Sequence, residues 1–216
     1  RSADLLYLPT EVATSELGVE LASVLQAGDT ILLHGKVGAG KSHLARAIIQ
    51  ARLGYPEDVP SPTYTLVQTY EASDVDLFHA DLYRLGDVTE LVELGLDEAL
   101  RDAVCLIEWA ERLGPDDTPD DALSLSLEPM EGGRLATLCY SAPSWEKISR
   151  VLNRSDFLIK AGWCGAARTQ VAGDLSARSY QRLNRIKSSA ILMYAGSDAV
   201  STTKFVKMTD WLNLHG

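Results

Sequence analysis

The sequence has few cysteines and lacks any long apolar run. Its 216 residues include three cysteines, which lie far apart and form no C-x-x-C pair: Cys105, Cys139 and Cys164. This pattern predicts neither a cysteine-based metal site nor a disulfide framework, and free thiols suit a reducing compartment. No apolar segment is long enough to cross a bilayer, and residues 1–10 alternate like a strand rather than a secretory signal. We therefore expect a cytoplasmic protein with no membrane partner.

Positive charge is scarce in the first two thirds of the chain. Residues 1–143 carry 9 Lys and Arg against 25 Asp and Glu, a net charge of −16, whereas residues 144–216 carry 11 against 5, a net charge of +6. This asymmetry predicts two modules, 1–143 and 144–216. Because contact with nucleic-acid phosphates needs clustered cations, we expect the first module to reach nucleic acid only through a partner. The alternative is that the acidic side chains merely aid solubility.

A glycine-rich turn between an apolar run and a helix pattern is the most informative stretch. Residues 31–49 read ILLHGKVGAGKSHLARAII, and Gly35, Gly40, Lys41 and Ser42 fill the pattern G-x-x-x-x-G-K-[ST]. In such a P-loop, backbone N–H groups point at phosphate oxygens beside a helix N-terminus. The lysine reaches the terminal phosphates and the hydroxyl binds Mg²⁺. The predicted nucleotide-binding residues of this loop are Gly35, Val37, Gly38, Ala39, Gly40, Lys41, Ser42 and His43.

The apolar pattern of residues 1–143 alternates between strands and helices. It predicts an α/β fold of the P-loop NTPase type, in which helices flank a mixed sheet. The expected strands are 5–8, 31–33, 65–71, 75–82, 103–109, 123–127 and 135–140, and the expected helices are 11–26, the segment from the P-loop to Gly54, and two short pieces within 88–101. Turn residues predict that 65–71 pairs with 75–82, and 123–127 with 135–140, as hairpins. Residues 55–64 contain three prolines and are expected to form an irregular loop.

Two acidic residues end apolar runs and are the predicted acids of the site. Asp81 closes the run in VDLFHADLYRL, and Glu108 closes the run in VCLIEWAERL. An NTPase needs a carboxylate at a strand end beside the P-loop, to hold Mg²⁺ through water or to position the attacking water. The sequence leaves open which acid does which, and either could be an ordinary strand-end carboxylate. His79 is interpreted as structural rather than catalytic.

A polar, proline-containing loop follows the P-loop helix. Its residues are Ser61, Pro62, Thr63, Tyr64 and Thr65. Many NTPases carry the segment that senses the γ-phosphate at this place, and these hydroxyls could donate to phosphate or help to bind Mg²⁺. The alternative is a Ser/Thr-rich turn without a ligand.

Several blocks behind the P-loop resemble one family. SPTYTLVQTYE, HADLYRL, ELGLDEAL and IEWAERL follow GKVGAGKS in the order and spacing of the TsaE (YjeE) family, between Leu5 and Ser141. These proteins are bacterial P-loop ATPases required for threonylcarbamoyladenosine modification of tRNA. The resemblance implies a Mg²⁺-dependent ATP hydrolase that works with a TsaB–TsaD pair. That pair performs the carbamoyl transfer, so this chain would meet tRNA only indirectly, through its partners.

By position, the resemblance assigns roles to individual residues. Lys41, Asp81 and Glu108 would be catalytic, Ser42, Asp81 and Glu108 would hold the metal, and Thr63, Thr65 and Trp109 would belong to the nucleotide site. One departure stands inside the P-loop, where the family usually has an acidic residue and this chain has Lys36. Phosphate binding does not depend on that side chain, because it rests mainly on backbone N–H groups.

Residues 144–216 carry a second resemblance. SDFLIKAG, at 155–162, has a helix-start residue and apolar spacing. VAGDLSARSYQRL, SSAILMYAG and TKFVKMTDWLNLHG then look like the opening of an aminoglycoside-phosphotransferase-like kinase: a turn between strands, another strand and a helix. We expect a partial α+β kinase-like N-lobe that lacks a catalytic loop and cannot transfer phosphate by itself. The alternative is a basic tail that docks on the acidic first module.

Two further functions are compatible with the P-loop. A small-molecule P-loop kinase would need an acceptor pocket and usually an arginine-rich lid, whereas Arg84, Arg101 and Arg112 are scattered. A nucleotide-gated scaffold would use binding more than turnover.

Overall fold

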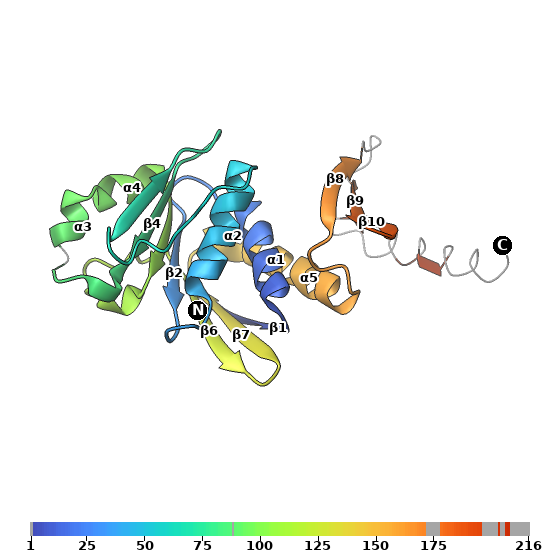
Figure 1. Cartoon of the computed structure of the whole chain (residues 1–216), viewed down its shortest axis with the longest axis horizontal. Helices are drawn as coiled ribbons and strands as arrows, with labels where there is room; N and C mark the ends of the chain where they lie inside the picture. Colours follow the sequence, from blue (N-terminus) through green and yellow to red (C-terminus); the bar gives the residue numbers. More distant parts are fainter. Residues whose placement is uncertain (1, 88, 172–177, 196–202, 204–205, 208–216) are drawn as a thin grey trace. The chain divides into compact units, whose positions relative to one another are not determined.

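The chain folds into two compact units, Arg1–Gly165 and Ala166–Gly216. A computed structural model describes residues 2–87, 89–171, 178–195, 203 and 206–207 (Figure 1). No helix among these residues is both long enough and apolar enough to span a bilayer. The first unit contains the P-loop.

Unit 1 is built on a seven-stranded mixed sheet of order β1-β7-β6-β2-β5-β4-β3. The strands are β1 Ser2–Leu8, β2 Thr30–His34, β3 Val67–Tyr70, β4 Leu77–Asp81, β5 Val104–Glu108, β6 Leu123–Met130 and β7 Gly133–Tyr140. The centre is parallel, because β2 pairs in parallel with both β5 and β6, and β4 with β5. The edges are antiparallel. The predicted mixed α/β fold is confirmed, as are the two hairpins.

Helices cover both faces of this sheet (Figure 1). The helices of unit 1 are α1 Glu11–Ala22, α2 Lys41–Leu53, α3 Thr89–Glu93, α4 Leu96–Asp102 and α5 Lys147–Lys160, with 3-10 turns η1 Leu82–Arg84, η2 Ala110–Arg112 and η3 Pro143–Glu146. Successive residues of a strand point to opposite faces, so in β2 Ile31 and Leu33 enter the core under α1 and α2, while Leu32 enters the core under α3 and α4. All five residues of β4 and of β5 are buried. This burial fixes the strand ends that carry the predicted acids.

The first unit extends past residue 143, where the charge asymmetry predicted a boundary. The sequence predicted a helix start at Ser155. Helix α5 instead begins at Lys147, and Ser155 is a buried residue within it. Ile148, Val151 and Leu152 of α5 join the core that also contains α1 and β1. A helix with so apolar a face is stabilised by packing on the sheet unit. The basic segment therefore contributes its first part to unit 1.

Unit 2 contains a three-stranded antiparallel sheet of order β10-β9-β8. Its strands are β8 Ala167–Val171, β9 Ser179–Arg185 and β10 Ser188–Tyr194. The predicted strand within SSAILMYAG matches β10. The predicted turn within VAGDLSARSYQRL falls mainly on 172–177, and the predicted helix in TKFVKMTDWLNLHG falls almost entirely on 204–205 and 208–216, which lie outside the described residues.

Candidate nucleotide site

The P-loop connects the carboxyl end of β2 to the start of α2. Gly35 has φ 135°, and a Cβ there would lie 2.5 Å from the backbone oxygen of Leu127 on the neighbouring strand β6. Gly40 caps α2 with φ 106°, and a Cβ on Gly40 would overlap Nη1 of Arg134. Gly35 therefore requires glycine, because its φ and the backbone oxygen of Leu127 exclude a side chain, and Gly40 requires glycine because of its positive φ. Gly40, Lys41, Ser42 and His43, at the start of α2, line the cavity described below, and the N-terminus of a helix is a common site of anion binding.

Lys41 turns its ammonium group toward its own loop. Nζ donates to the carbonyl oxygens of Gly35, at 2.7 Å, and Lys36, at 3.2 Å, and lies 3.7 Å from the ring centroid of Trp109. The residue is buried, and burial lowers the pKa of Lys41, while the nearby carboxylates, Glu108 foremost, act in the opposite direction. The ammonium group thus lies in a partly desolvated position, where an anionic ligand would stabilise its charge.

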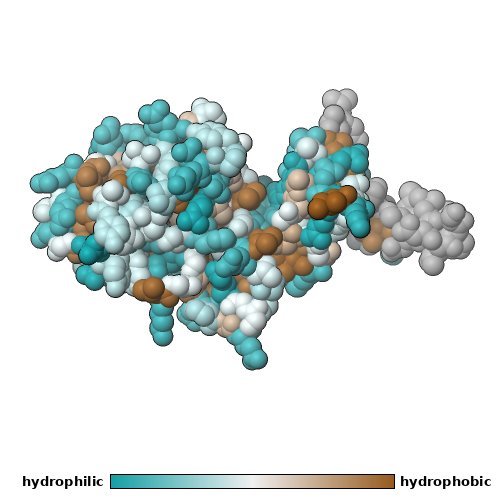
Figure 2. All heavy atoms as spheres, in the orientation of Figure 1, coloured by the Kyte–Doolittle hydropathy of each residue, from teal (hydrophilic) through white to brown (hydrophobic). Residues whose placement is uncertain are grey.

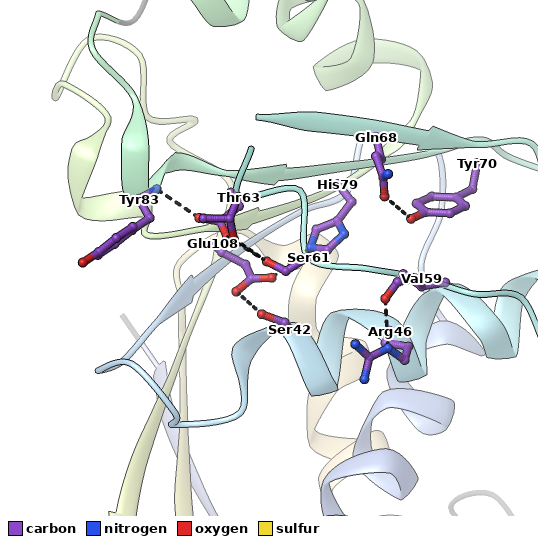
Figure 3. A network of polar contacts seen from close by, with 11 residues as sticks. Ser42, Arg46, Val59, Ser61, Thr63, Gln68, Tyr70, His79, Tyr83 and Glu108 are labelled. Carbon is purple, nitrogen blue, oxygen red and sulfur yellow. Dashed lines mark hydrogen bonds and ion pairs between the residues drawn. The ribbon is translucent and has the colours of Figure 1, made fainter. Parts of the chain in front are cut away.

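Glu108 ends β5 and links the P-loop helix to β4 (Figure 3). Ser42 Oγ donates to Glu108 Oε2 at 2.8 Å, and His79 Nε2 lies 2.9 Å from Glu108 Oε1. Glu108 and His79 are each 1% exposed. The carboxylate is therefore held from both sides, by the hydroxyl predicted to bind the metal and by a buried imidazole.

Asp81 ends β4, directly beside Glu108 in the sheet register. Its Oδ2 accepts hydrogen bonds from Ser61 Oγ at 2.8 Å and Thr63 Oγ1 at 2.6 Å, and its Oδ1 accepts one from the N–H of Tyr83 at 3.0 Å (Figure 3). Hydrogen bonds to an ionised acceptor are shorter and stronger than neutral ones. Asp81 consequently ties the loop of hydroxyls to the strand end, rather than contacting the P-loop itself.

Side chains of α2 hold the earlier part of that loop. Arg46 Nε donates to the carbonyl oxygen of Val59 at 2.9 Å (Figure 3). Gln50 Nε2 donates to the carbonyl oxygen of Glu57 at 2.8 Å. Val59 is buried in the core beside α2. The irregular loop predicted over 55–64 is confirmed, and these contacts connect it to the P-loop helix.

Trp109 follows Glu108 and has a left-handed backbone, with φ 58°. A non-glycine residue in this region is strained, and such strain is often found at functional sites. The conformation places the indole ring against Lys41 Nζ, and its centroid lies 5.0 Å from that of Tyr83. Trp109 therefore forms part of the wall around the lysine.

These groups surround one cavity of about 560 Å³. It is lined by Glu11, Val37, Gly38, Gly40, Lys41, Ser42, His43, Ser61, Thr63, Asp81, Tyr83, Glu108, Trp109 and Arg134. The volume is within the range of small-molecule sites. Of the predicted site residues, Gly35 and Ala39 belong to the loop but do not line the cavity, and Thr65 is exposed and lies outside the lining. The side chain of Lys36 is also exposed and outside it.

Three lining residues were not predicted as site residues: Glu11, Tyr83 and Arg134. Tyr83 stands two positions after Asp81, so its proximity follows from the block HADLYRL. Glu11 starts the helix that packs on α2, and Arg134 follows the turn of a distant hairpin. No local sequence signal identifies these two, because only the packing of α1 on α2 and the order β7-β6-β2 bring them to the P-loop.

The donor set of the cavity suits a hard divalent cation. Mg²⁺ is usually bound by one or two carboxylates and by substrate phosphates, with waters completing the octahedron. The hydroxyl of Ser42 and the carboxylate of Glu108 already lie in contact, and Asp81 ends the adjacent strand. Among the residues that the structure describes, no three His, Cys, Asp or Glu side chains form a cluster that could hold a metal alone. The residues present therefore fit Mg²⁺ shared with phosphate.

The parallel strands, the glycine-rich loop and the helix behind it define a P-loop NTPase-like protein. Comparison with known proteins narrows this class. Residues 8–135 match the sequence profile of the family described as threonylcarbamoyl adenosine biosynthesis protein TsaE. This chain belongs to the TsaE family.

Individual relatives agree with this membership. The protein of Rickettsia conorii called tRNA threonylcarbamoyladenosine biosynthesis protein TsaE is 37% identical over 151 residues, which cover 70% of this chain and 85% of the relative. Proteins with the same name are 43% identical in Rickettsia felis, over 50% of this chain and 63% of the relative, and 38% identical in Haemophilus influenzae, over 49% and 70%. The crystal structure of Bacillus subtilis YdiB superposes with a TM-score of 0.60 at 25% identity, covering 72% of this chain and 97% of YdiB. The TsaE homologues take part in tRNA threonylcarbamoyladenosine biosynthesis.

Proposed function

We propose that this protein is a Mg²⁺-dependent ATPase that supports threonylcarbamoyl modification of tRNA adenosine, in the cytoplasm and together with TsaB-like and TsaD-like partners. The observation that carries the proposal is the single cavity in which Lys41 and Ser42 of the P-loop face Glu108 and Asp81. Membership of the TsaE family supports a role in tRNA threonylcarbamoyladenosine biosynthesis. The residues that line the cavity support ATP hydrolysis with Mg²⁺.

In this proposal, the P-loop stabilises the charge of the phosphates. The N–H groups at the start of α2 point into the cavity, and the ammonium of Lys41 turns from the carbonyl oxygens of Gly35 and Lys36 to the phosphate oxygens. Preorganised donors of this kind contribute most where charge develops during reaction. Trp109 keeps contact with the lysine and limits the access of water on that side.

The two acids divide the remaining work. Ser42 and Glu108 would hold Mg²⁺, with His79 orienting the carboxylate from behind. The bound ion would neutralise charge on the phosphates. Asp81 orients Ser61 and Thr63, whose hydroxyls then lie at the side of the cavity where the terminal phosphate is hydrolysed. The loop is thereby coupled to the nucleotide state, as in other switch segments.

The charge of the protein supports an indirect relation to tRNA. Residues 1–143 carry a net charge of −16, and the face of unit 1 seen in Figure 2 is mainly hydrophilic, with hydrophobic residues scattered over it. Affinity for nucleic acid depends on neutralising its phosphates with cations. We infer that the partners bind the tRNA and that this chain supplies the ATPase cycle.

We also propose that unit 2 is the start of an aminoglycoside-phosphotransferase-like lobe. The antiparallel order β10-β9-β8 is compatible with this assignment. An unrelated small sheet would have the same order. The discriminating observation is whether the reading frame of the gene continues into a catalytic loop with a metal-binding aspartate.

The function is tested with purified protein, TsaB, TsaD and unmodified tRNA. Lys41→Ala should abolish ATP hydrolysis and most nucleotide affinity, and tRNA modification should stop. Full hydrolysis by this variant would refute the proposal. Phosphate transfer to a metabolite rather than to water would instead identify a small-molecule kinase.

A further inference from the structure

The side chain of Arg134 lies beside the P-loop because of the order of strands in the sheet. Arg134 stands second in β7, beyond β6 from the P-loop strand β2. Its guanidinium lies against Gly40: a Cβ added to Gly40 would overlap Arg134 Nη1. Arg134 also lines the same cavity as Lys41 and Ser42. The guanidinium therefore lies beside the capping residue of α2, where that helix presents its first N–H groups.

No protein group neutralises this guanidinium within the part of the chain that the structure describes. Arg134 is half-buried, and none of the hydrogen bonds or ion pairs of the described residues involves it. Glu11 lines the cavity as well but forms no ion pair with it. Removing a charge from water is costly unless a partner compensates. A planar guanidinium fits phosphate oxygens with two parallel hydrogen bonds.

The sheet order indicates which phosphates Arg134 would meet. Strands β5 and β4, with Glu108 and Asp81 at their ends, lie on one side of β2, and β6 and β7, with Arg134, lie on the other. Under the proposed function, the phosphate that is hydrolysed faces the two acids. The phosphates that stay with the nucleoside then lie toward Arg134.

We propose that Arg134 binds the α-phosphate of the nucleotide, whose charge is the same in ATP and ADP and does not change when the terminal phosphate is cleaved. The inference rests on the proposed nucleotide site but assigns a residue and a task that the P-loop motif does not contain. Because the contact is the same before and after hydrolysis, it strengthens binding uniformly and leaves the barrier of the chemical step unchanged.

The test measures binding and turnover separately in the full chain with Mg²⁺. Calorimetry gives the dissociation constants of ADP and of a non-hydrolysable ATP analogue, and a phosphate-release assay gives kcat at saturating ATP. Arg134→Gln should weaken both nucleotides equally, by about tenfold to a hundredfold, which is the cost of one lost charge-assisted pair. Its kcat should stay within about threefold of the unmodified protein. Arg134→Lys should fall between, because it keeps the charge and loses the fork.

Arg101→Gln is the matched control, since Arg101 is an exposed arginine of α4 outside the cavity. Thermal unfolding of each variant reports on the fold. ADP affinity that is unchanged in a folded Arg134→Gln would overturn the inference and leave the proposed ATPase intact. Unchanged ADP affinity with a large fall in kcat would also overturn it, because Arg134 would then act on the γ-phosphate. Failure of the unmodified protein to bind either nucleotide would instead refute the proposed function, and with it the assignment.

Discussion

Two adjacent strand ends carry similar acids with different attachments. Glu108 of β5 is fixed to the P-loop helix through Ser42 and to the neighbouring strand through His79. Asp81 of β4 is fixed to Ser61 and Thr63 in the loop that follows that helix. Both carboxylates are buried, and they pair in register. Strand β5 is next to the P-loop strand β2, and β4 lies one strand further away. Glu108 therefore reaches the P-loop helix, whereas Asp81 reaches only the loop that follows it.

This difference suggests how the acids share their tasks. An acid bonded to the P-loop serine is placed to assist the metal, whereas an acid bonded to loop hydroxyls is placed to control the loop. Sequence alone left the two roles interchangeable. The predictions below separate them, beginning with the largest expected effect.

Replacing Glu108 by glutamine should affect the chemical step most. Glu108→Gln keeps the shape of the side chain but loses the charge that would support Mg²⁺, so we expect kcat to fall by about a thousandfold, as for removal of other charge-stabilising groups. ATP-analogue affinity should change much less. Single-turnover hydrolysis and calorimetry measure the two quantities.

Glu98→Gln, on the exposed side of α4, serves as the control for loss of one negative charge. If Glu108→Gln hydrolyses ATP at the normal rate, the assignment of Glu108 to the metal is wrong. If it binds ATP, barely hydrolyses it and still supports tRNA modification, the protein is a nucleotide-gated scaffold.

Replacing Asp81 by asparagine should act through the loop. Asp81→Asn replaces one carboxylate oxygen by an NH2 donor, so the side chain can no longer accept hydrogen bonds both from Ser61 and Thr63 and from the N–H of Tyr83. We expect kcat to fall by about a hundredfold, a cost typical of misplaced groups. Amide hydrogen exchange of residues 61–65 should become faster, which Glu108→Gln should not cause.

The exposed Asp76→Asn, just before β4, is the matched control for this variant. Equal acceleration of exchange in Asp81→Asn and Glu108→Gln would contradict the division of roles. Unchanged exchange in both would show that hydrogen bonds to Asp81 do not order the loop.

The sequence predicted the elements around the site well because they are short and strongly patterned. The P-loop, the apolar strands and the turn residues of both hairpins are local signals, and each lies where it was predicted. The pairing of Glu108 with Ser42 and of Asp81 with Ser61 depends on strand order, which periodicity does not encode. Arg134 illustrates the same limit, since its approach to Gly40 needs β7, β6 and β2 in that order.

The misplaced start of α5 has a different cause. Ser155 is typical of a helix N-cap in isolation, but Ile148, Val151 and Leu152 extend the apolar stripe toward the N-terminus. Burial of that stripe on unit 1 outweighs the local preference. The first compact unit thus ends at Gly165, beyond the change in net charge after residue 143.

His79 tests how far the orientation of Glu108 matters. His79→Leu removes the contact at Glu108 Oε1, whereas His79→Gln can restore a donor near the same place. We expect kcat to fall by about tenfold in His79→Leu, in line with losses seen when outer partners of metal ligands are removed. Recovery of kcat in His79→Gln, together with a normal requirement for Mg²⁺, would support the role of His79 in orienting Glu108. Equal losses in two folded variants would contradict it.

The smallest expected effect concerns Glu20, a buried acid far from the strand ends. Arg154 Nη1 of α5 lies 3.2 Å from Glu20 Oε2, yet burial raises the pKa of Glu20 from 4.5 to about 7, against the lowering influence of Arg154. Between pH 4.5 and 7 the folded chain therefore holds a proton that the unfolded chain has released. Stability from this group is present at low pH and is lost as the pH rises through that window.

Glu20→Gln removes this titration and provides the measurement. The unmodified protein should lose roughly 1–3 kcal/mol more of its unfolding free energy between pH 5 and pH 8 than Glu20→Gln does. Urea unfolding at several pH values gives both curves, and their difference isolates Glu20 from the site acids. Parallel curves would show that the Glu20 carboxylate is ionised in the folded protein at pH 5, and that Arg154 compensates its burial.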